Sequence, residues 1–158
     1  MIWSPGHERV RALVDAGELE QVEPSVEVAQ RLVRDAEQHV ASARAIVATS
    51  DFTGAYQLAY DALRKSAAAL LAVQGLRATS RGGHIAVQDT AIEQFGQTVG
   101  AFKAFGRLRR NRNRFEYPGD SASEPTNDDV DDAISVAAEA ANRARVIIEQ
   151  NVLDAWTG

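Results

Sequence analysis

The sequence predicts an all-α protein, an up-and-down antiparallel bundle of four to five helices with a short N-terminal helical arm. Apolar residues recur at three- and four-residue steps along most of the 158-residue chain, which is the spacing of one face of an α-helix. The connections between these segments are short, which favours antiparallel neighbours. No segment alternates apolar and polar residues with β-branched or aromatic enrichment, so we expect no sheet.

The chain divides into an N-terminal arm over residues 1–24, a helical bundle over residues 25–150 and a C-terminal tail over residues 151–158. The arm holds one amphipathic turn that ends at Gly17, because glycine readily adopts the left-handed backbone that closes a helix. The length of the chain favours a single domain.

The first two helices of the bundle begin at side chains that accept hydrogen bonds from free backbone N–H groups. Ser25 caps a helix expected over about residues 25–49, and Asp51 caps a helix over about residues 53–74. Gly75 follows the second apolar stripe and is expected to stop that helix.

A third helical pattern opens at His84 and closes at Gly96. A fourth begins near Val99 and is expected to finish around Glu116, because Pro118 disfavours the helical backbone in the residue before it.

A fifth helix over about residues 128–150 follows a loop over residues 118–125 and is expected to be capped by Asn127. Its first turns carry four carboxylates where the helix dipole favours negative charge. These are Asp128, Asp129, Asp131 and Asp132.

The composition excludes several classes of protein. The chain has no cysteine and only three histidines, which removes disulfides, thiolate nucleophiles and cysteine-ligated metal sites, so we expect no metal and no cofactor. No apolar run approaches the ~20 residues of a membrane span, and the start lacks a secretory leader, so we expect a cytoplasmic protein. A net charge of −5 gives no reason to expect nucleic acid unless a local basic patch is present.

One segment departs from this acidic background. Five arginines fall within eight residues: Arg107, Arg109, Arg110, Arg112 and Arg114. A guanidinium offers five donors in a fixed fork that suits phosphate, so the cluster predicts an anion site. The alternative is a solvated helix end whose charges are neutralised by the acidic stretch of residues 120–132. Composition alone leaves both interpretations open.

Arg112 falls within the apolar stripe of its helix. At ~100° per residue it shares one arc with Phe105, Leu108 and Phe115. Because arginine is rarely buried without a partner, Arg112 should meet a carboxylate, a backbone carbonyl or, as we prefer, a groove formed by a second chain. The opposite side of the helix carries three residues at steps of four and three, which are Arg110, Arg114 and Tyr117.

The segment from Arg110 to Tyr117, with the sequence RNRNRFEY, resembles the signature of HEPN-domain proteins. In that signature an arginine, four to six residues often opening with asparagine, a histidine, one further residue and often a tyrosine occur late in a helical bundle. Residues 59–67 and the loop over residues 82–84 are also similar to bacterial HEPN proteins. The resemblance covers about residues 25–150 and implies a five-helix layout.

Phe115 stands where the ribonucleases of that family carry histidine. A second register, which begins at Arg112, places Tyr117 at the histidine position, and a phenol with a pKa near ~10 is a poor base at neutral pH. The resemblance therefore implies HEPN ancestry more strongly than nuclease activity.

Three functions from different classes follow from the resemblance and the arginine cluster. The leading one is a dimeric HEPN-like module that has lost the catalytic histidine and binds RNA or a partner protein through an arginine-lined groove. The RNA contacts would come from Arg107, Arg109, Arg110, Asn111, Arg112, Arg114 and Tyr117.

The second is a metal-independent endoribonuclease of a toxin–antitoxin or defence system, which would use Arg110, Arg112 and Tyr117 as catalytic residues. The resemblance also implies a small nucleotidyltransferase as a partner, which would modify Tyr117. The third is an interaction protein or antitoxin-like partner, in which the arginines pair with the aspartates of the fifth helix.

The remaining polar candidates have simpler interpretations. His84 could approach the arginines across the bundle, but a packing or loop-anchoring role is expected for it. Gly82 and Gly83 are expected to form a simple turn. Three charged residues are expected to be exposed without a site, which are Asp61, Arg64 and Lys65.

Overall fold

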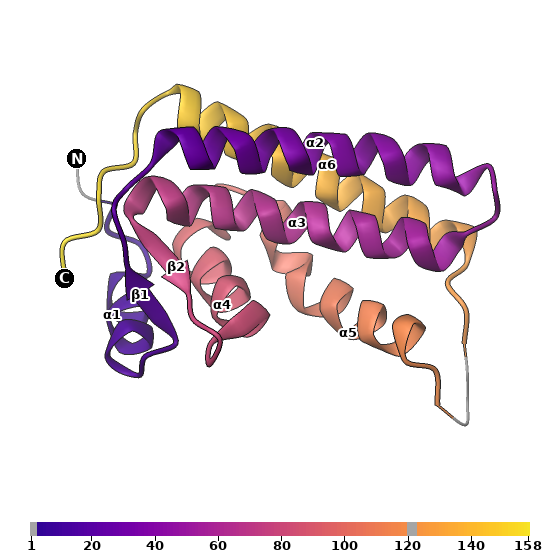
Figure 1. The fold of residues 1–158 in the computed structure, drawn as a ribbon, viewed down its shortest axis with the longest axis horizontal. Helices are drawn as coiled ribbons and strands as arrows, with labels where there is room; N and C mark the ends of the chain where they lie inside the picture. The colour runs from indigo at the N-terminus through magenta and orange to yellow at the C-terminus, as the bar shows by residue number, and fades with distance from the viewer. Residues whose placement is uncertain (1–2, 120–122) are drawn as a thin grey trace.

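The computed structural model describes residues 3–119 and 123–158, and it confirms the all-α prediction. Three long helices lie side by side, and they are α2 (Val26–Val47), α3 (Phe52–Gln74) and α6 (Asn127–Glu149) (Figure 1). α2 and α3 run antiparallel, and α6 returns alongside them in the direction of α3. The arrangement leaves one side of α3 uncovered by α2 and α6.

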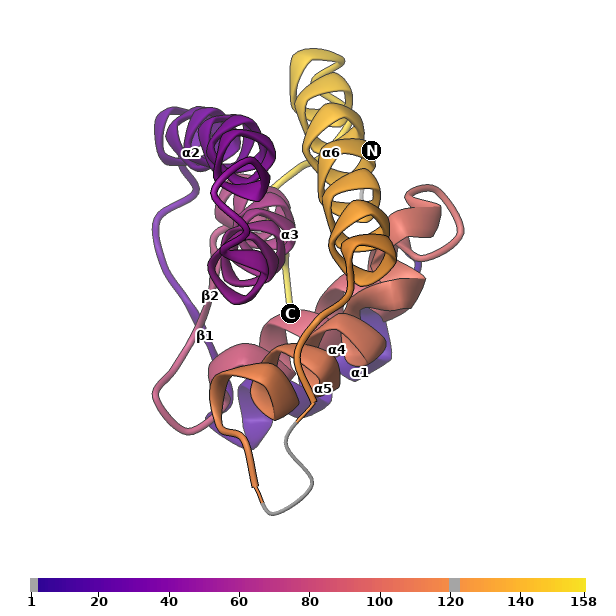
Figure 2. The same ribbon diagram turned by 90° about the vertical axis from the view of Figure 1, so that its right-hand side faces the viewer.

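A second group of helices covers that side of α3. It contains α4 (Gly83–Phe95) and α5 (Phe105–Glu116), which lie below α3 and α6 in Figure 2. The expected single helix from near Val99 is divided, because a 3-10 helix, η1 (Gly100–Ala104), precedes α5. Residues three apart eclipse one another in a 3-10 turn, and Val99 and Phe102 are both fully buried. The end of α5 at Glu116 is as predicted.

The N-terminal arm packs against the bundle. Its helix α1 (His7–Asp15) buries Val10 and Leu13 in an apolar cluster that also contains Trp156. The backbone N–H of Trp156 donates to the carbonyl of Gln74 at the end of α3, at 2.9 Å. The first and last segments of the chain therefore lie at the same end of the bundle (Figure 1).

The prediction of no sheet is wrong. The strands β1 (Leu19–Gln21) and β2 (Leu76–Ala78) pair antiparallel as a two-stranded sheet. Each strand has three residues, which is too short to show the alternation by which strands are recognised in a sequence. Leu19 and Leu76 are buried, so the pair also fixes the arm to the end of α3.

The caps of α2 and α3 are as predicted. The Ser25 side chain accepts a hydrogen bond from the N–H of Val28 at 3.1 Å, and Asp51 accepts one from Gly54 at 2.8 Å. Gly75 closes α3 with a φ of 71°, a backbone region in which only glycine is unstrained.

The predicted cap of α6 is wrong by one residue. Thr126 rather than Asn127 is the cap, and its hydroxyl accepts from the N–H of Asp129 at 3.1 Å. The Asp129 carboxylate accepts in return from the N–H of Thr126 at 2.8 Å. This reciprocal capping box satisfies two backbone donors at once, so Asp129 already has a structural role at the start of α6.

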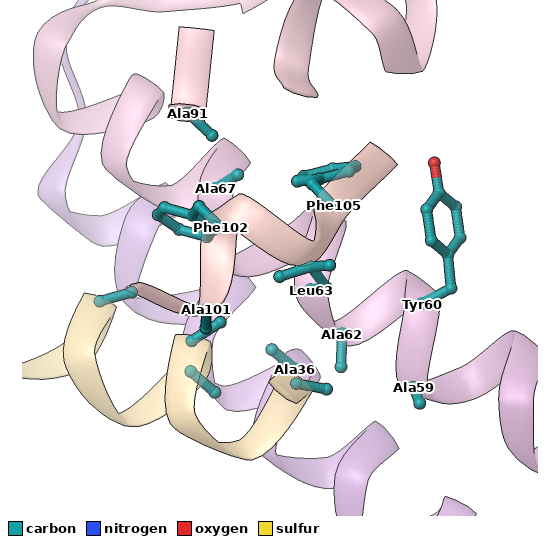
Figure 3. Packing of buried hydrophobic residues seen from close by; sticks show 14 of the residues in the cluster. Ala36, Ala59, Tyr60, Ala62, Leu63, Ala67, Ala91, Ala101, Phe102 and Phe105 are labelled. Atoms are coloured by element: carbon teal, nitrogen blue, oxygen red, sulfur yellow. The ribbon is translucent and has the colours of Figure 1, made fainter. Parts of the chain in front are cut away.

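The core among the three long helices is built on small side chains. Ala36 of α2 and Ala59 and Ala62 of α3 are fully buried, and their size lets the helices approach closely (Figure 3). Tyr60 lies at the margin of this core, and its ring meets Phe105 of α5 edge-on at 5.9 Å between centroids. Figure 3 shows the Tyr60 hydroxyl directed away from the alanine contacts.

Residues 3–119 and 123–158 contain neither a candidate membrane span nor a candidate metal site. No helix there is long and apolar enough to cross a bilayer. The same residues contain no cluster of three or more His, Cys, Asp or Glu side chains that could hold a metal ion. Residues 120–122 of the predicted loop lie outside the described residues, and so does Asp120 as a predicted partner of the arginines.

Candidate functional site

α5 buries its apolar stripe as predicted. Phe105, Leu108 and Phe115 are all buried. The ring of Phe115 is 6% exposed and meets the ring of Tyr56 edge-on at 5.1 Å between centroids. The residue at the histidine position of the RNRNRFEY segment therefore belongs to the core, where it cannot reach a substrate.

Arg112 is half-buried beside α3. Its Nε donates to Oε1 of Gln57 at 2.6 Å, and its Nη1 donates to Oδ1 of Asn113 at 3.0 Å. Its guanidinium carbon lies 5.8 Å from the centroid of the Tyr60 ring, a cation–π distance. Within the chain the partner is thus a side-chain amide, which corrects the expected carboxylate or backbone carbonyl. An amide fixes the guanidinium without neutralising its charge.

Arg109 is held in the same way from the other side. It is half-buried, and its Nε donates to Oε1 of Gln88 on α4 at 2.9 Å. Gly106, one turn earlier on α5, leaves room for this contact, since a Cβ there would lie 3.3 Å from the Gln88 amide nitrogen. Two arginines of α5 are therefore oriented by neutral glutamines from α3 and α4.

His84, in the first turn of α4, lies beside the same arginines. Its Nδ1 is 3.1 Å from the hydroxyl of Tyr60, and the two rings are tilted at 5.8 Å between centroids. Tyr60 is only 1% exposed, whereas His84 is exposed. A buried phenol thus anchors one nitrogen of an accessible imidazole.

The pKa of His84 lies below its ordinary value. Although His84 as a whole residue is exposed, its ring packs against Tyr60, and the resulting loss of water around the ring is the largest cause, because it disfavours the charged imidazolium. The positive charges of Arg64, Arg112 and Arg109 act in the same direction, and Asp61 opposes them. The imidazole is therefore neutral at pH 7.

We call the group formed by Tyr60 of α3, His84 of α4, and Arg109 and Arg112 of α5 the three-helix site. The sequence predicts its arginines, favours a packing or anchoring role over a catalytic one for His84, and assigns no role to Tyr60. The one available signal was the position of His84 at a helix start after two glycines.

The other arginines of the cluster differ in their surroundings. Among residues 3–119 and 123–158, Arg107 alone of the five forms an ion pair with a carboxylate, at 3.1 Å from Asp132. Arg110 and Arg114 are exposed, and the guanidinium carbon of Arg114 lies 5.0 Å from the Phe115 ring centroid. The acidic start of α6 therefore neutralises one arginine within the described residues.

Tyr117 and Asn111 lie apart from the three-helix site. Tyr117 is 71% exposed and follows the last residue of α5, so it leaves the helical alignment with Arg110 and Arg114 that the sequence predicts. Asn111 is half-buried. Burial raises the pKa of the Tyr56 phenol, and Asn111 opposes that rise.

Asp61 organises a charged network next to the three-helix site. Its carboxylate accepts from Nε of Arg64 at 3.1 Å and lies 3.4 Å from Lys65 and 3.2 Å from His39. Burial acts to raise the pKa of Asp61, but the hydrogen bond from Arg64 and the neighbouring positive charges outweigh it, so that pKa is lowered. These side chains are half-buried rather than exposed as expected, because they join α2 to α3.

A comparison with known proteins agrees with the helical layout. The family model described as HEPN domain matches residues 29–147, from the first turn of α2 to the last turn of α6. No curated protein and no solved structure gives a significant match. The matched residues form one helical unit that includes all four members of the three-helix site, and the chain belongs to the HEPN domain family.

Proposed function

We propose that this protein binds single-stranded RNA through the three-helix site and the exposed arginines of α5. The observation that carries the proposal is the state of the arginine charges. In a chain with a net charge of −5, four of the five arginines have no ion pair with a carboxylate of the described residues. They are Arg109, Arg110, Arg112 and Arg114.

The hydrogen bonds of Arg109 and Arg112 favour a phosphate ligand. Each uses its Nε for a glutamine oxygen, so the fork is fixed before a ligand arrives. Among the described residues, neither terminal nitrogen of Arg109 nor Nη2 of Arg112 has a hydrogen-bond partner. A pre-oriented guanidinium loses little side-chain entropy when it binds phosphate.

The exposed Tyr117 ring adds a second kind of contact. Bases of single-stranded RNA stack on aromatic side chains, and stacking tolerates any base. Tyr117 directly follows the helix that carries Arg110 and Arg114, and it would hold a base while the arginines contact the RNA backbone. This arrangement favours single-stranded RNA over a duplex, whose bases are already stacked.

The working unit in this proposal is a homodimer. Ile85, the neighbour of His84 in the first turn of α4, is 52% exposed. Large apolar side chains of this kind beside a site favour burial by another chain. Size-exclusion chromatography with light scattering tests this part, and a monomer at all concentrations would remove the second chain from the proposal.

Fluorescence anisotropy with a labelled single-stranded RNA tests the binding function. We expect Arg112→Gln and Arg109→Gln each to weaken binding by about tenfold, the effect of losing one charged hydrogen bond of roughly 1.4 kcal/mol. Arg31→Gln is the matched control, because it removes the same charge from an exposed position on α2. Equal binding by all four proteins would contradict the proposal.

The interaction protein and the endoribonuclease, the two other functions that the sequence suggests, would use the arginines differently. An interaction protein held by ion pairs would need the aspartates of α6, of which Asp132 pairs with Arg107. A nuclease that uses Arg110, Arg112 and Tyr117 stays a prediction, as does a nucleotidyltransferase partner. Mass spectrometry of Tyr117 after co-expression with a neighbouring nucleotidyltransferase tests the latter, and an unmodified residue would remove it.

A further inference from the structure

We propose that a groove between α2, α3, β2 and α4 binds a small amphipathic anion, a carboxylate that carries one aliphatic chain of medium length. The groove has a volume of about 430 Å³, which falls within the ~300–1,000 Å³ of small-molecule sites. Its lining residues include no member of the three-helix site. The proposal therefore goes beyond RNA binding and does not depend on it.

The walls of the groove are mostly apolar. β2 runs from the end of α3 toward α4 (Figure 1), and the groove lies where these elements meet the first turns of α2. Its apolar lining includes Val28 and Leu32 from α2, Leu76 from β2 and Val87 from α4. Walls of this kind offer few hydrogen-bonding groups, so they suit an aliphatic chain.

Two alanines of α3 leave the groove open. Ala68 and Ala72 are four residues apart, so they share one face of the helix, and both line the groove and are half-buried. Val28, which also lines the groove, is 50% exposed. Water therefore meets apolar surface here. Each CH₂ of a ligand that leaves water in such a groove raises affinity by about fourfold.

Two arginines line the same groove. Nε and Nη2 of Arg64 donate to Asp61, and Nε and Nη2 of Arg77 donate to Glu20. Among the residues that the structure describes, Nη1 of neither arginine has a hydrogen-bond partner. Each guanidinium therefore keeps donors for a second carboxylate.

The charges of the lining favour an anionic head group. Arg64 and Arg77 carry two positive charges, against one negative charge on Glu23. Glu23 is exposed, so water and salt screen its charge. The side chain of Arg64 is only 27% exposed, and a charge in such a place interacts more strongly than one in open water. An aliphatic chain among the apolar walls would thus bring its carboxylate to the arginines.

Isothermal titration calorimetry with decanoate, below the concentration at which it forms micelles, tests the binding. We expect saturable binding at one site. Octanoate, which is two CH₂ groups shorter, should bind about fifteenfold more weakly. Decanol, which has the same chain without the charge, should bind about tenfold more weakly, the effect of losing one charged hydrogen bond. The absence of saturable decanoate binding, or equal binding of all three compounds, would overturn the proposal.

Ala68→Leu tests the location of the site, because the longer side chain fills the groove from α3. We expect decanoate binding to weaken at least tenfold. Ala138→Leu is the matched control: Ala138 is also half-buried but lies on α6, which contributes no lining residue, and it should bind decanoate like the wild type. Amide NMR spectra show whether both variants are folded. Wild-type affinity in a folded Ala68→Leu variant would overturn the proposal.

Arg77→Gln tests the choice of head group. The Arg77 side chain is 66% exposed, so the fold should not depend on it. We expect decanoate to bind about tenfold more weakly and decanol to bind as it does to the wild type. Arg31→Gln, at an exposed position of α2 outside the groove, should change neither affinity. A decanoate affinity that Arg77→Gln leaves intact would overturn the proposal of an anionic ligand.

Discussion

The hydroxyl of Tyr60 lies 3.1 Å from Nδ1 of His84, although 24 positions separate the two residues in the chain. The contact joins α3 to α4 at the place where Arg112 of α5 lies near the Tyr60 ring. One buried phenol therefore connects a titratable group and a fixed cation.

Tyr60→Phe should release the His84 imidazole without reducing RNA affinity. The substitution keeps the ring beneath Arg112 and against Phe105 but removes the hydroxyl that positions His84. We expect the imidazole signals of His84 to shift, because Nδ1 loses the hydroxyl that lies 3.1 Å away, while the RNA affinity stays close to wild type. The measurement is NMR of the His84 imidazole together with the Kd for RNA. Unchanged imidazole signals would show that the hydroxyl does not position His84.

The pKa of His84 should lie below the ordinary value near ~6.5. Arg112→Gln should raise this pKa, because it removes a positive charge that disfavours the imidazolium. Titration of the imidazole proton signals by NMR measures both values, and Arg31→Gln should leave the pKa unchanged. A fall of the pKa in Arg112→Gln would contradict the arrangement.

The same shift predicts how stability depends on pH. The unfolded chain binds a proton at His84 at a higher pH than the folded chain does, so acid favours unfolding. The contribution of His84 to stability is thus present above about pH 6.5 and is lost as the pH falls through the folded pKa. Urea unfolding at pH 7.5 and 5.5 measures this loss, which should be smaller in His84→Gln. An equal loss in both proteins would assign it to other groups.

Phe115→His should destabilise the fold. Phe115 is 6% exposed and packs on Tyr56, so the substitution removes apolar contact and buries a polar ring. We expect a loss of about 2–3 kcal/mol in the free energy of unfolding, measured by urea denaturation. An unchanged free energy of unfolding in Phe115→His would show that position 115 is not part of the core.

Arg107 and Asp132 should contribute little to stability. Their side chains are 47% and 49% exposed, and exposed ion pairs contribute about 0–1 kcal/mol. A double-mutant cycle with Arg107→Glu and Asp132→Arg should give a coupling energy in that range. A coupling well above it would favour the function in which the arginines hold an ionic interface.

Local sequence patterns predict most of the helical layout. Ser25, Asp51 and Gly75 fix the ends of α2 and α3 through contacts within a few residues, and such contacts are readable from the sequence. The sheet is not readable, because Leu19 and Leu76 are far apart in the chain and each strand has only three residues. Pairing of this kind depends on how the arm folds back onto α3.

Local sequence patterns predict the arginines of the candidate site but not their partners. The arginine cluster is visible because its members are neighbours in the chain, but the partners of Arg112 and Arg109 come from other helices. The helical wheel places Arg112 in the apolar stripe correctly, yet it cannot name Gln57. The approach of His84 to Tyr60 likewise depends on the packing of α4 against α3.

The salt dependence of RNA binding tests the central claim most directly. If the unpaired arginines of α5 bind phosphates, log Kd rises linearly with log salt concentration, and single strands contribute a slope of about 0.7 for each neutralised phosphate. The slope should fall by about 0.7 in Arg112→Gln and stay constant in Arg31→Gln. An affinity that does not change with salt, or a slope that Arg112→Gln leaves intact, would contradict the account.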